Sequence, residues 1–401
     1  MINSPIDSKS AGQRNEHLIL SMLRKHGRLS QSELCRLAGI RSSTASTIVA
    51  RLREKGFVTE RRGSSSKRGP KPILVELNPD YLYLIGIEIN PSYLVLGLFN
   101  FVGFLKNKIR IPLGEDHSIG HVLTLLKDRL PDLLDDHRID GSQIMGAGVT
   151  LSGSVTPDGN ISLSSPMGWK NINLKEKLSA VLPFPVSVFS NRVRLLAEFE
   201  VQPELASRNI LYINAANGVG STLYMNGQLV FGASGRYGEI GHIIADPAGP
   251  LCGCGHQGCL EAIISGPALA AKIKQDIQHG TKTAFANSIS HTPEELLADW
   301  PVHIERGDRY ALQLREYVSR YISWAAAILI NCYDPDIIIL AGYVVLPFLP
   351  FLAQKIQQQI QTSVYDNALR EIPIIPAQAG EDALIKGVAA AVIRQTHSPI
   401  W

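Results

Sequence analysis

Apolar residues near the N-terminus recur at helical spacing in three short segments. The first runs from Gln13 to His26, and the third occupies residues 41–56. The second begins at Ser30, whose spacing from Glu33 predicts a capping box, and ends before Gly39. The positions that we expect to face inward are Leu18, Ile19, Met22, Leu23, Leu34, Leu37, Ala38, Ala45, Ile48, Val49 and Leu52. This pattern predicts a compact unit of three helices.

The outward face of the third predicted helix is small and polar, which suits entry into the major groove of DNA. The residues expected to contact DNA there are Arg41, Ser42, Ser43, Ser46, Thr47 and Arg51. Two β-prone runs around a Gly/Ser turn follow at 57–77, and they predict the wing of a winged helix-turn-helix. In the extended KRGPKP segment, Arg68 is expected to reach a narrow minor groove. The alternative is a three-helix interaction domain with a solvated, charged hairpin.

After Asn78-Pro79 the pattern changes to strand-like runs that are interrupted by helices. Strands are predicted at 81–89, 92–100, 104–113, 144–151, 210–215, 221–232 and 336–342. Helices are predicted near 118–136, 263–273, 317–329 and 383–393. This order indicates an α/β architecture that opens with an antiparallel meander. We therefore expect a first domain over 1–78 and a second over 79–401, with two lobes that divide near residue 190 and a C-terminal helix that returns to the first lobe.

Composition and charge separate these two parts further. The 401 residues are 45% hydrophobic and 19% charged, which is typical of a globular protein with two or three cores. Residues 1–80 hold 15 Lys and Arg against 7 Asp and Glu, whereas the remainder holds 24 against 29. The basic part therefore favours nucleic acid as a partner. Because the N-terminus lacks the apolar core of a signal peptide and no apolar run is long enough for a membrane span, we expect a cytoplasmic protein without a membrane partner.

Three cysteines and a histidine lie within eighteen residues and form a zinc-ligand set. His242 belongs to the run GEIGH, and Cys252, Cys254 and Cys259 belong to CGCGHQGC. Four protein ligands leave no position for an activated water, so the predicted Zn²⁺ is structural. We expect Gly253, Gly255 and Gly258 to permit the sharp turns. The alternatives are a reduced cysteine cluster or disulfides, and the odd total of five cysteines argues against a disulfide framework. Cys35 and Cys332 are predicted to be buried.

These motifs together resemble the ROK family of repressors and sugar kinases over nearly the whole chain. The resemblance rests on GEIGH, CGCGHQGCLE, the preceding NGVGSTLYMNGQLVFGASG and the winged helix. It implies an actin-like, two-lobed sugar-kinase fold with a sugar cleft between the lobes. In the DNA-binding members, which include the N-acetylglucosamine, xylose and glucose-uptake repressors, a winged helix precedes that fold.

The resemblance also implies a sugar-binding set. Glu239, His242 and Glu261 match hydroxyl-binding positions, and Asn191 matches a position in the same cleft. Zinc bound by His242 would fix the wall of the sugar cleft that is formed by Glu239, His242 and Glu261. Arg192 follows Asn191 and favours an anionic ligand, such as a sugar phosphate or sugar acid. One alternative is that Asn191, Glu239, His242 and Glu261 only pack around the zinc. Another is that Arg192 points outward or pairs with a neighbouring acid.

Three segments depart from what the resemblance implies for ATP chemistry. The phosphate loop, which reads Asp-x-Gly-Gly-Thr in family kinases, is replaced by Glu88, Asn90, Pro91 and Ser92. Proline has no amide proton to donate to phosphate. The catalytic Asp is replaced by Arg192, and an arginine cannot act as a base. The nucleotide-side glycine pair also departs, because Ala341 and Tyr343 stand on either side of Gly342. The NGVGSTL loop is ambiguous, because it keeps Gly218 and Gly220 but has Ser221 and Thr222 where the family has further glycines.

We therefore predict a transcriptional regulator, most simply a repressor of carbohydrate-metabolism genes, with a catalytically inactive effector domain. Its expected partners are a double-stranded DNA operator, a sugar or sugar phosphate effector, and further copies of itself in a dimer or tetramer. One alternative is an ATP-dependent sugar kinase with a basic extension. The other is a regulator that a protein partner controls instead of a sugar.

Overall fold

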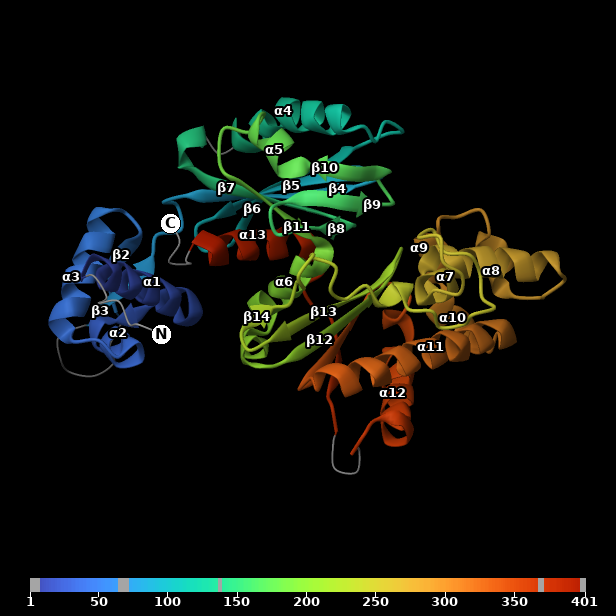
Figure 1. Cartoon of the computed structure of the whole chain (residues 1–401). Helices are drawn as coiled ribbons and strands as arrows, with labels where there is room; N and C mark the ends of the chain where they lie inside the picture. The colour runs from blue at the N-terminus through green and yellow to red at the C-terminus, as the bar shows by residue number, and fades with distance from the viewer. Residues whose placement is uncertain (1–7, 64–71, 136–138, 367–370, 397–401) are drawn as a thin grey trace. The chain divides into compact units, whose positions relative to one another are not determined.

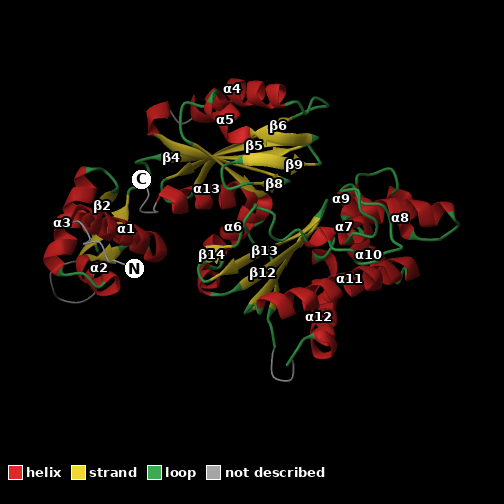
Figure 2. Cartoon of the chain, in the orientation of Figure 1, coloured by secondary structure: helices red, strands yellow, loops and turns green. Residues whose placement is uncertain are grey.

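The computed structural model describes residues 8–63, 72–135, 139–366 and 371–396 (Figure 1). The chain divides into two compact units. The first comprises Met1–Ser152, Asp158–Leu196 and Leu384–Trp401, and the second comprises Gly153–Pro157 and Ala197–Ala383. Each unit contains one five-stranded sheet together with helices (Figure 2). No helix of the described residues is both long enough and apolar enough to cross a membrane.

The first unit begins with a winged helix-turn-helix. Its elements are α1 (Ser8–His26), β1 (Leu29–Ser30), α2 (Gln31–Ala38), α3 (Ser42–Glu54), β2 (Val58–Arg62) and β3 (Ile73–Leu77), and its strands pair in the order β1-β3-β2. The predicted capping box of Ser30 and Glu33 is present, and Gly39 ends α2 with a φ of 64°. The buried stripe of α3 is confirmed, whereas Leu37 and Ala38 are only half-buried.

The large sheet of the first unit follows. Its strands are β4 (Tyr83–Asn90), β5 (Tyr93–Asn100), β6 (Leu105–Pro112), β7 (Ile144–Leu151) and β11 (Val186–Ser190), in the order β11-β7-β4-β5-β6. The opening meander is antiparallel as predicted, and β7 runs parallel to β4 and β11. Helices α4 (Ile119–Asp135) and α5 (Leu174–Ser179) lie over one face, and α13 (Ala383–Thr396) lies over the other (Figure 1). Gly148 permits the close approach of α13, because a Cβ there would lie 2.2 Å from Val388 Cγ1.

Smaller elements complete the first unit around this sheet. The strands β9 (Asn160–Ser164) and β10 (Trp169–Asn173) form an antiparallel pair. The short helices are η1 (Gly141–Gln143) and η2 (Asn191–Val193), and α6 (Arg194–Val201) begins at the end of this unit. Because η2 follows β11 directly, the sheet fixes the backbone position of Asn191 and Arg192.

The second unit is built on a sheet of order β14-β13-β12-β15-β16. The strands of this sheet are β12 (Ile210–Ala215), β13 (Val219–Met225), β14 (Gln228–Leu229), β15 (Ile337–Ala341) and β16 (Ile374–Pro376). The short strand β8 (Ser154–Val155) also belongs to this unit but lies outside that sheet. Its α-helices are α7 (Leu260–Ile264), α8 (Gly266–Gln278), α9 (Pro293–Ala298), α10 (Trp300–Glu305), α11 (Arg309–Tyr333) and α12 (Leu349–Ser363), and its 3-10 helices are η3 (Pro203–Ser207), η4 (Ile240–His242), η5 (Ala284–Ser288) and η6 (Leu346–Phe348).

Helix α11 corrects one expectation about the cysteines. The apolar run around Cys332 predicts a buried side chain, but Cys332 is exposed near the end of α11. The apolar residues around it include Ile330, which faces the core of the second unit. A run of apolar residues in a helix therefore did not fix which way each side chain faces. Cys35 is half-buried instead of fully buried.

Candidate nucleic-acid interface and metal centre

The structure gathers six of the seven predicted DNA-contacting residues on the exposed side of α3. Arg41, Ser42, Ser43, Ser46, Thr47 and Arg51 are all exposed. Thr47 Oγ1 donates to the backbone carbonyl of Ser43 at 3.0 Å, so this hydroxyl is oriented by the helix itself. A hollow of about 800 Å³ is lined by Ser46, Thr47, Ala50, Arg51, Arg53 and Glu54. The seventh residue, Arg68, lies outside the described residues.

Carboxylates that the sequence reasoning missed hold the basic side chains of this module. Glu16 of α1 pairs with Arg51, and its second oxygen lies 3.5 Å from Lys55 Nζ. Arg53 pairs with Glu60 at 2.6 Å. Glu76 of the wing similarly receives Arg28 and Arg61. Exposed ion pairs contribute little stability, so their main effect is to orient the guanidinium groups. Nothing local in the sequence could indicate pairs that join distant elements.

The four predicted zinc ligands meet in the second unit. Their ligand atoms lie within 4.8 Å of one another. Cys252 Sγ lies 3.7 Å from His242 Nδ1, and Cys254 Sγ lies 3.6 Å from Cys259 Sγ. A tetrahedral Zn²⁺ with Zn–S bonds of about 2.3 Å separates two sulfur ligands by about 3.8 Å. The donor set and its spacing therefore fit a tetrahedral zinc ion.

The metal-binding run at residues 252–259, here called the knuckle, contains three glycines. At two of them the backbone conformation favours glycine. Gly255 has a φ of +93° and Gly258 a φ of +76°, which favour glycine. A Cβ on Gly258 would also lie 1.6 Å from the carbonyl oxygen of Asp246. Gly253, which we expected to share this role, has no positive φ and no heavy atom within 4 Å of a built Cβ. Gly255 and Gly258, in the second half of the knuckle, are therefore the positions where the backbone conformation favours glycine.

The thiols of the knuckle differ in acidity. Burial opposes ionisation of Cys254, but hydrogen bonds from the backbone and side chain of His256 help to lower its pKa to about 6. Burial and the neighbouring thiols raise the pKa of Cys259 to about 12. His256 Nδ1 lies 3.4 Å from Cys254 Sγ, a contact that the sequence reasoning missed although His256 stands within the CGCGHQGC run. Cys254 is therefore the thiol most readily available as a thiolate.

The second unit also brings together the three predicted sugar-binding residues that belong to it. The amide of His242 donates to the carbonyl oxygen of Glu239 at 3.1 Å. Glu261 Oε2 accepts the amide of Val219 at 2.9 Å. A Cβ on Gly218 would lie 2.8 Å from the same oxygen, so the glycine allows the loop to approach the carboxylate. Glu261 therefore holds the NGVGSTL loop against the wall that contains His242.

Asn191 and Arg192 belong to the first unit. Asn191 Oδ1 accepts from Thr150 Oγ1 at 2.9 Å, and Asn191 Nδ2 donates to Ser152 Oγ at 2.8 Å. Arg192 is 9% exposed, and its Nη1 donates to Ser190 Oγ at 3.2 Å. The alternative in which Arg192 points outward is therefore wrong.

The segment that replaces the phosphate loop is a tight turn between β4 and β5. Asn90 pairs with Tyr93, which leaves only Pro91 and Ser92 to make the turn. The amide of Ser92 donates to Asn90 Oδ1 at 3.0 Å. Pro91 has no amide proton, and that of Ser92 is engaged, so this turn presents no amide cradle for a phosphate.

Two further residues occupy the segments that depart from kinase chemistry. Burial raises the pKa of Glu88, while Arg194 opposes that shift. Tyr343 follows Gly342, whose φ is +100°. The Tyr343 hydroxyl donates to Asn217 Oδ1 at 2.5 Å, and a Cβ on Gly266 would lie 2.1 Å from the same hydroxyl. The tyrosine therefore fills the space beside the start of α8.

Comparisons with known proteins agree with this two-part architecture. The sequence profile of the ROK family matches residues 86–395, and that of the MarR family matches residues 13–69. A xylose repressor of Caldicellulosiruptor bescii is 24% identical over 388 residues, which cover 95% of this chain and 96% of the repressor. A glucokinase of Halalkalibacterium halodurans is 26% identical over 274 residues, which cover 65% of this chain and 80% of the glucokinase.

A solved structure supports the fold of both parts. The crystal structure of a ROK family transcriptional regulator, a homologue of the Escherichia coli MLC protein, has a TM-score of 0.82 at 22% identity. The match covers 97% of each chain. The predicted fold, a winged helix-turn-helix followed by a sugar-kinase-like α/β body, is therefore confirmed.

Proposed function

The chain belongs to the ROK family, and on that premise we propose that it is a sugar-responsive transcriptional repressor whose kinase-like body no longer transfers phosphate. The observation that carries the proposal is the exposed polar face of α3 in a winged helix-turn-helix that precedes the family domain. A sequence relative of similar length is a xylose repressor, whereas the glucokinase relative matches only 65% of the chain.

The DNA-binding role follows from the chemistry of α3. The hydroxyls of Ser42, Ser43 and Ser46 meet base edges or phosphates in the major groove, and Arg51 meets the backbone. Glu16 holds the guanidinium of Arg51 in place for that contact. One winged helix gives modest affinity, so two copies of the chain read a palindromic operator as a dimer or as half of a tetramer.

The effector role follows from the hydroxyl-binding set. Glu239, Glu261 and His242 supply acceptors and donors for a sugar, and Asn191 supplies an amide. Zinc, when it is bound by His242, Cys252, Cys254 and Cys259, fixes the wall that contains His242. The buried guanidinium of Arg192 favours a ligand with an anionic group. A clear preference for a neutral sugar over its phosphate in a binding titration would overturn that last point.

Loss of phosphotransfer is supported by the Pro91–Ser92 turn and by Arg192. Neither amide of the turn is available to phosphate, and a protonated arginine takes no proton from a sugar hydroxyl. The rival function is an ATP-dependent sugar kinase, which the glucokinase relative favours. ATP-dependent phosphorylation of a sugar by the purified protein, lost in Arg192→Ala, would establish that rival.

Repression responds to sugar through linkage. If sugar binding favours a state of the body in which paired winged helices no longer match the operator half-sites, it weakens DNA binding by the same factor by which DNA weakens sugar binding. A third possible function is a repressor that a protein partner controls instead of a sugar. Its DNA affinity would be the same with every sugar but would change when a cell extract is added.

Selection of genomic fragments by the purified protein tests the proposal. At physiological salt, non-specific phosphate binding weakens while specific sites persist. The proposal expects discrete palindromic sites beside carbohydrate genes. Diffuse binding that disappears as salt rises contradicts it.

A further inference from the structure

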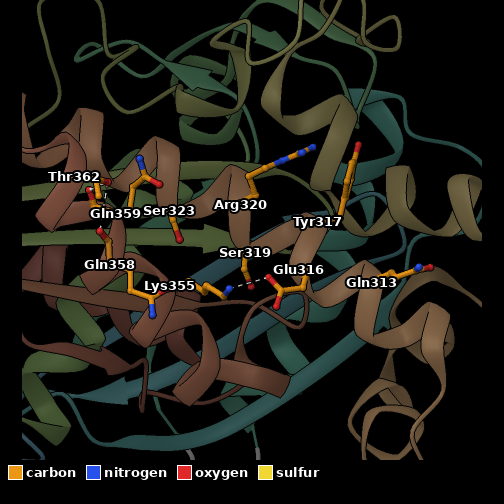
Figure 3. A pocket seen from close by; sticks show the side chains of 10 residues that line it. All are labelled: Gln313, Glu316, Tyr317, Ser319, Arg320, Ser323, Lys355, Gln358, Gln359 and Thr362. Atoms are coloured by element: carbon orange, nitrogen blue, oxygen red, sulfur yellow. Dashed lines mark hydrogen bonds and ion pairs between the residues drawn. The ribbon is translucent and has the colours of Figure 1, made fainter.

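A groove lined by polar and charged residues runs between helices α11 and α12 of the second unit (Figure 3). Its volume is about 640 Å³, which lies in the range of small-molecule sites. Glu316, Ser319, Arg320 and Ser323 line it from α11, and Lys355 and Gln359 line it from α12. None of these residues belongs to the zinc knuckle, the hydroxyl-binding set or the DNA-binding face.

Two buried hydroxyls of the groove lack a partner. Ser319 is fully buried and Ser323 is 3% exposed. Neither Oγ has a hydrogen-bond partner among the residues that the structure describes. Because the two serines lie four residues apart on α11, they share one face of the helix. A buried hydroxyl without a hydrogen-bond partner destabilises the folded protein, so packing alone would favour alanine at both positions.

The charged groups of the groove favour an anion. Lys355 Nζ pairs with Glu316 Oε2 at 3.1 Å, and this pair joins the two helices (Figure 3). Arg320 is exposed, and its guanidinium lies 5.0 Å from the centroid of the Tyr321 ring. A guanidinium near an aromatic ring is attracted to the ring, and its N–H groups are donors that suit a carboxylate or a phosphate. Two cations against one carboxylate give the groove a net positive charge.

We propose that this groove binds a small hydroxylated organic anion of the sugar-phosphate or sugar-acid class. The anionic group pairs with Arg320, and hydroxyls of the ligand bond to Ser319 and Ser323. Gln359, whose Nε2 donates to Ser363 Oγ at 2.6 Å, also lines the groove. The site is a second, regulatory one, and it stands independently of the proposed sugar site because every contributing side chain lies on α11 or α12.

Calorimetric titration of the full-length protein tests this site. The ligands are glucose 6-phosphate, whose anionic group is a phosphate, and glucuronate, whose anionic group is a carboxylate. Glucose, which has no charge, is the control. We expect at least one anion to bind and glucose to bind at least tenfold more weakly. Arg320→Gln should weaken anion binding about tenfold or more. The matched control is Arg309→Gln, an exposed arginine on the same helix outside the groove, which should bind like the wild type.

The serines provide a second readout. The double variant Ser319→Ala, Ser323→Ala should weaken binding of the hydroxylated anion about tenfold while leaving the unfolding temperature unchanged or higher, because no internal hydrogen bond is lost. A lower unfolding temperature with unchanged binding would assign the serines to packing and overturn their role.

Three further outcomes decide the proposal. Anion binding that survives Glu261→Gln supports a site separate from the sugar wall, whereas binding lost in that variant and kept in Arg320→Gln contradicts it. Inorganic phosphate that binds as tightly as both organic anions also overturns the ligand class. If no anion binds and Arg320→Glu instead dissociates the oligomer, the groove is a contact between copies of the chain, and the ligand proposal is wrong.

Discussion

Arg24 of α1 donates a hydrogen bond of 2.8 Å from Nη2 to the backbone carbonyl of Phe101, which follows β5 of the large sheet. The same guanidinium lies 5.4 Å from the centroid of the Phe101 ring. Phe101 is 1% exposed and belongs to the hydrophobic cluster formed mainly by the winged helix. The DNA-binding module and the first lobe of the body therefore share one hydrophobic core, to which Phe101 belongs.

The first prediction concerns this shared core. Phe101→Ala should lower the free energy of unfolding by about 3 kcal/mol, because a buried aromatic side chain is lost from a packed cluster. DNA affinity should fall, since the winged helix loses its support. Val102→Ala is the matched control, because Val102 is 40% exposed. Chemical denaturation and DNA titration of both variants check this, and equal behaviour of the two would contradict it.

The second prediction concerns the knuckle backbone. Gly258→Ala should lose zinc and destabilise the protein by about 2–4 kcal/mol, because its Cβ would meet the Asp246 carbonyl at 1.6 Å and its φ is positive. Gly253→Ala, where a Cβ has open space, should retain stoichiometric zinc. Metal analysis of the two purified variants separates them. Retention of zinc by both would show that the knuckle tolerates a shifted backbone.

The third prediction concerns the metal itself. The double variant Cys252→Ser, Cys254→Ser should purify without zinc and unfold at a lower temperature, because zinc binding adds to folding free energy. It should also lose the response of DNA binding to sugar, since the His242 wall loosens. Cys332→Ser is the control, because Cys332 is exposed and stands apart from the knuckle. A double variant that folds and responds normally would refute the structural role of zinc.

The residues that could be predicted are those whose partners are close in sequence. Ala45, Ile48, Val49 and Leu52 face inward because α3 repeats locally, and Cys252, Cys254 and Cys259 meet because only a few residues separate them. The contact of Arg24 with Phe101 spans 77 residues and leaves no local pattern. The pairing of Glu16 with Arg51 and the groove between α11 and α12 escaped prediction for the same reason, since tertiary packing alone brings their residues together.

The fourth prediction uses the buried carboxyl of Glu88. Burial raises its folded-state pKa above the ordinary value, so its charged form is disfavoured in the folded protein. Protonated Glu88 therefore supports the fold at low pH, and this contribution is lost as the pH rises through the folded-state pKa. Glu88→Gln should raise the unfolding temperature at pH 7 and match the wild type at pH 4.

Thermal unfolding at several pH values checks the Glu88 prediction. The Tyr93 hydroxyl, which lies 3.3 Å from Glu88 Oε1, can bond to the amide oxygen of the variant in the same way. A variant that is less stable at every pH would mean that the attraction of Arg194 for the carboxylate outweighs the cost of burial.

The fifth prediction separates the roles of two α3 residues. Arg51→Ala should weaken binding to all DNA sequences about fivefold to tenfold and reduce the salt slope by about one, because it removes one phosphate contact. Ser46→Ala should instead change the preference at one base pair, at a cost of about 1–3 kcal/mol for the best site. Titrations against a set of single-base operator variants at two salt concentrations check both. A uniform effect of Ser46→Ala would place its hydroxyl on a phosphate.

The central claim is that sugar binding and operator binding are coupled in one protein. The most direct test measures the affinity of the full-length protein for one selected operator at physiological salt, with and without each candidate sugar and its phosphate. We expect one such ligand to weaken operator binding about fivefold or more, and operator DNA to weaken binding of that ligand by the same factor. Operator binding that no sugar or sugar phosphate changes would show that the two binding events are not coupled.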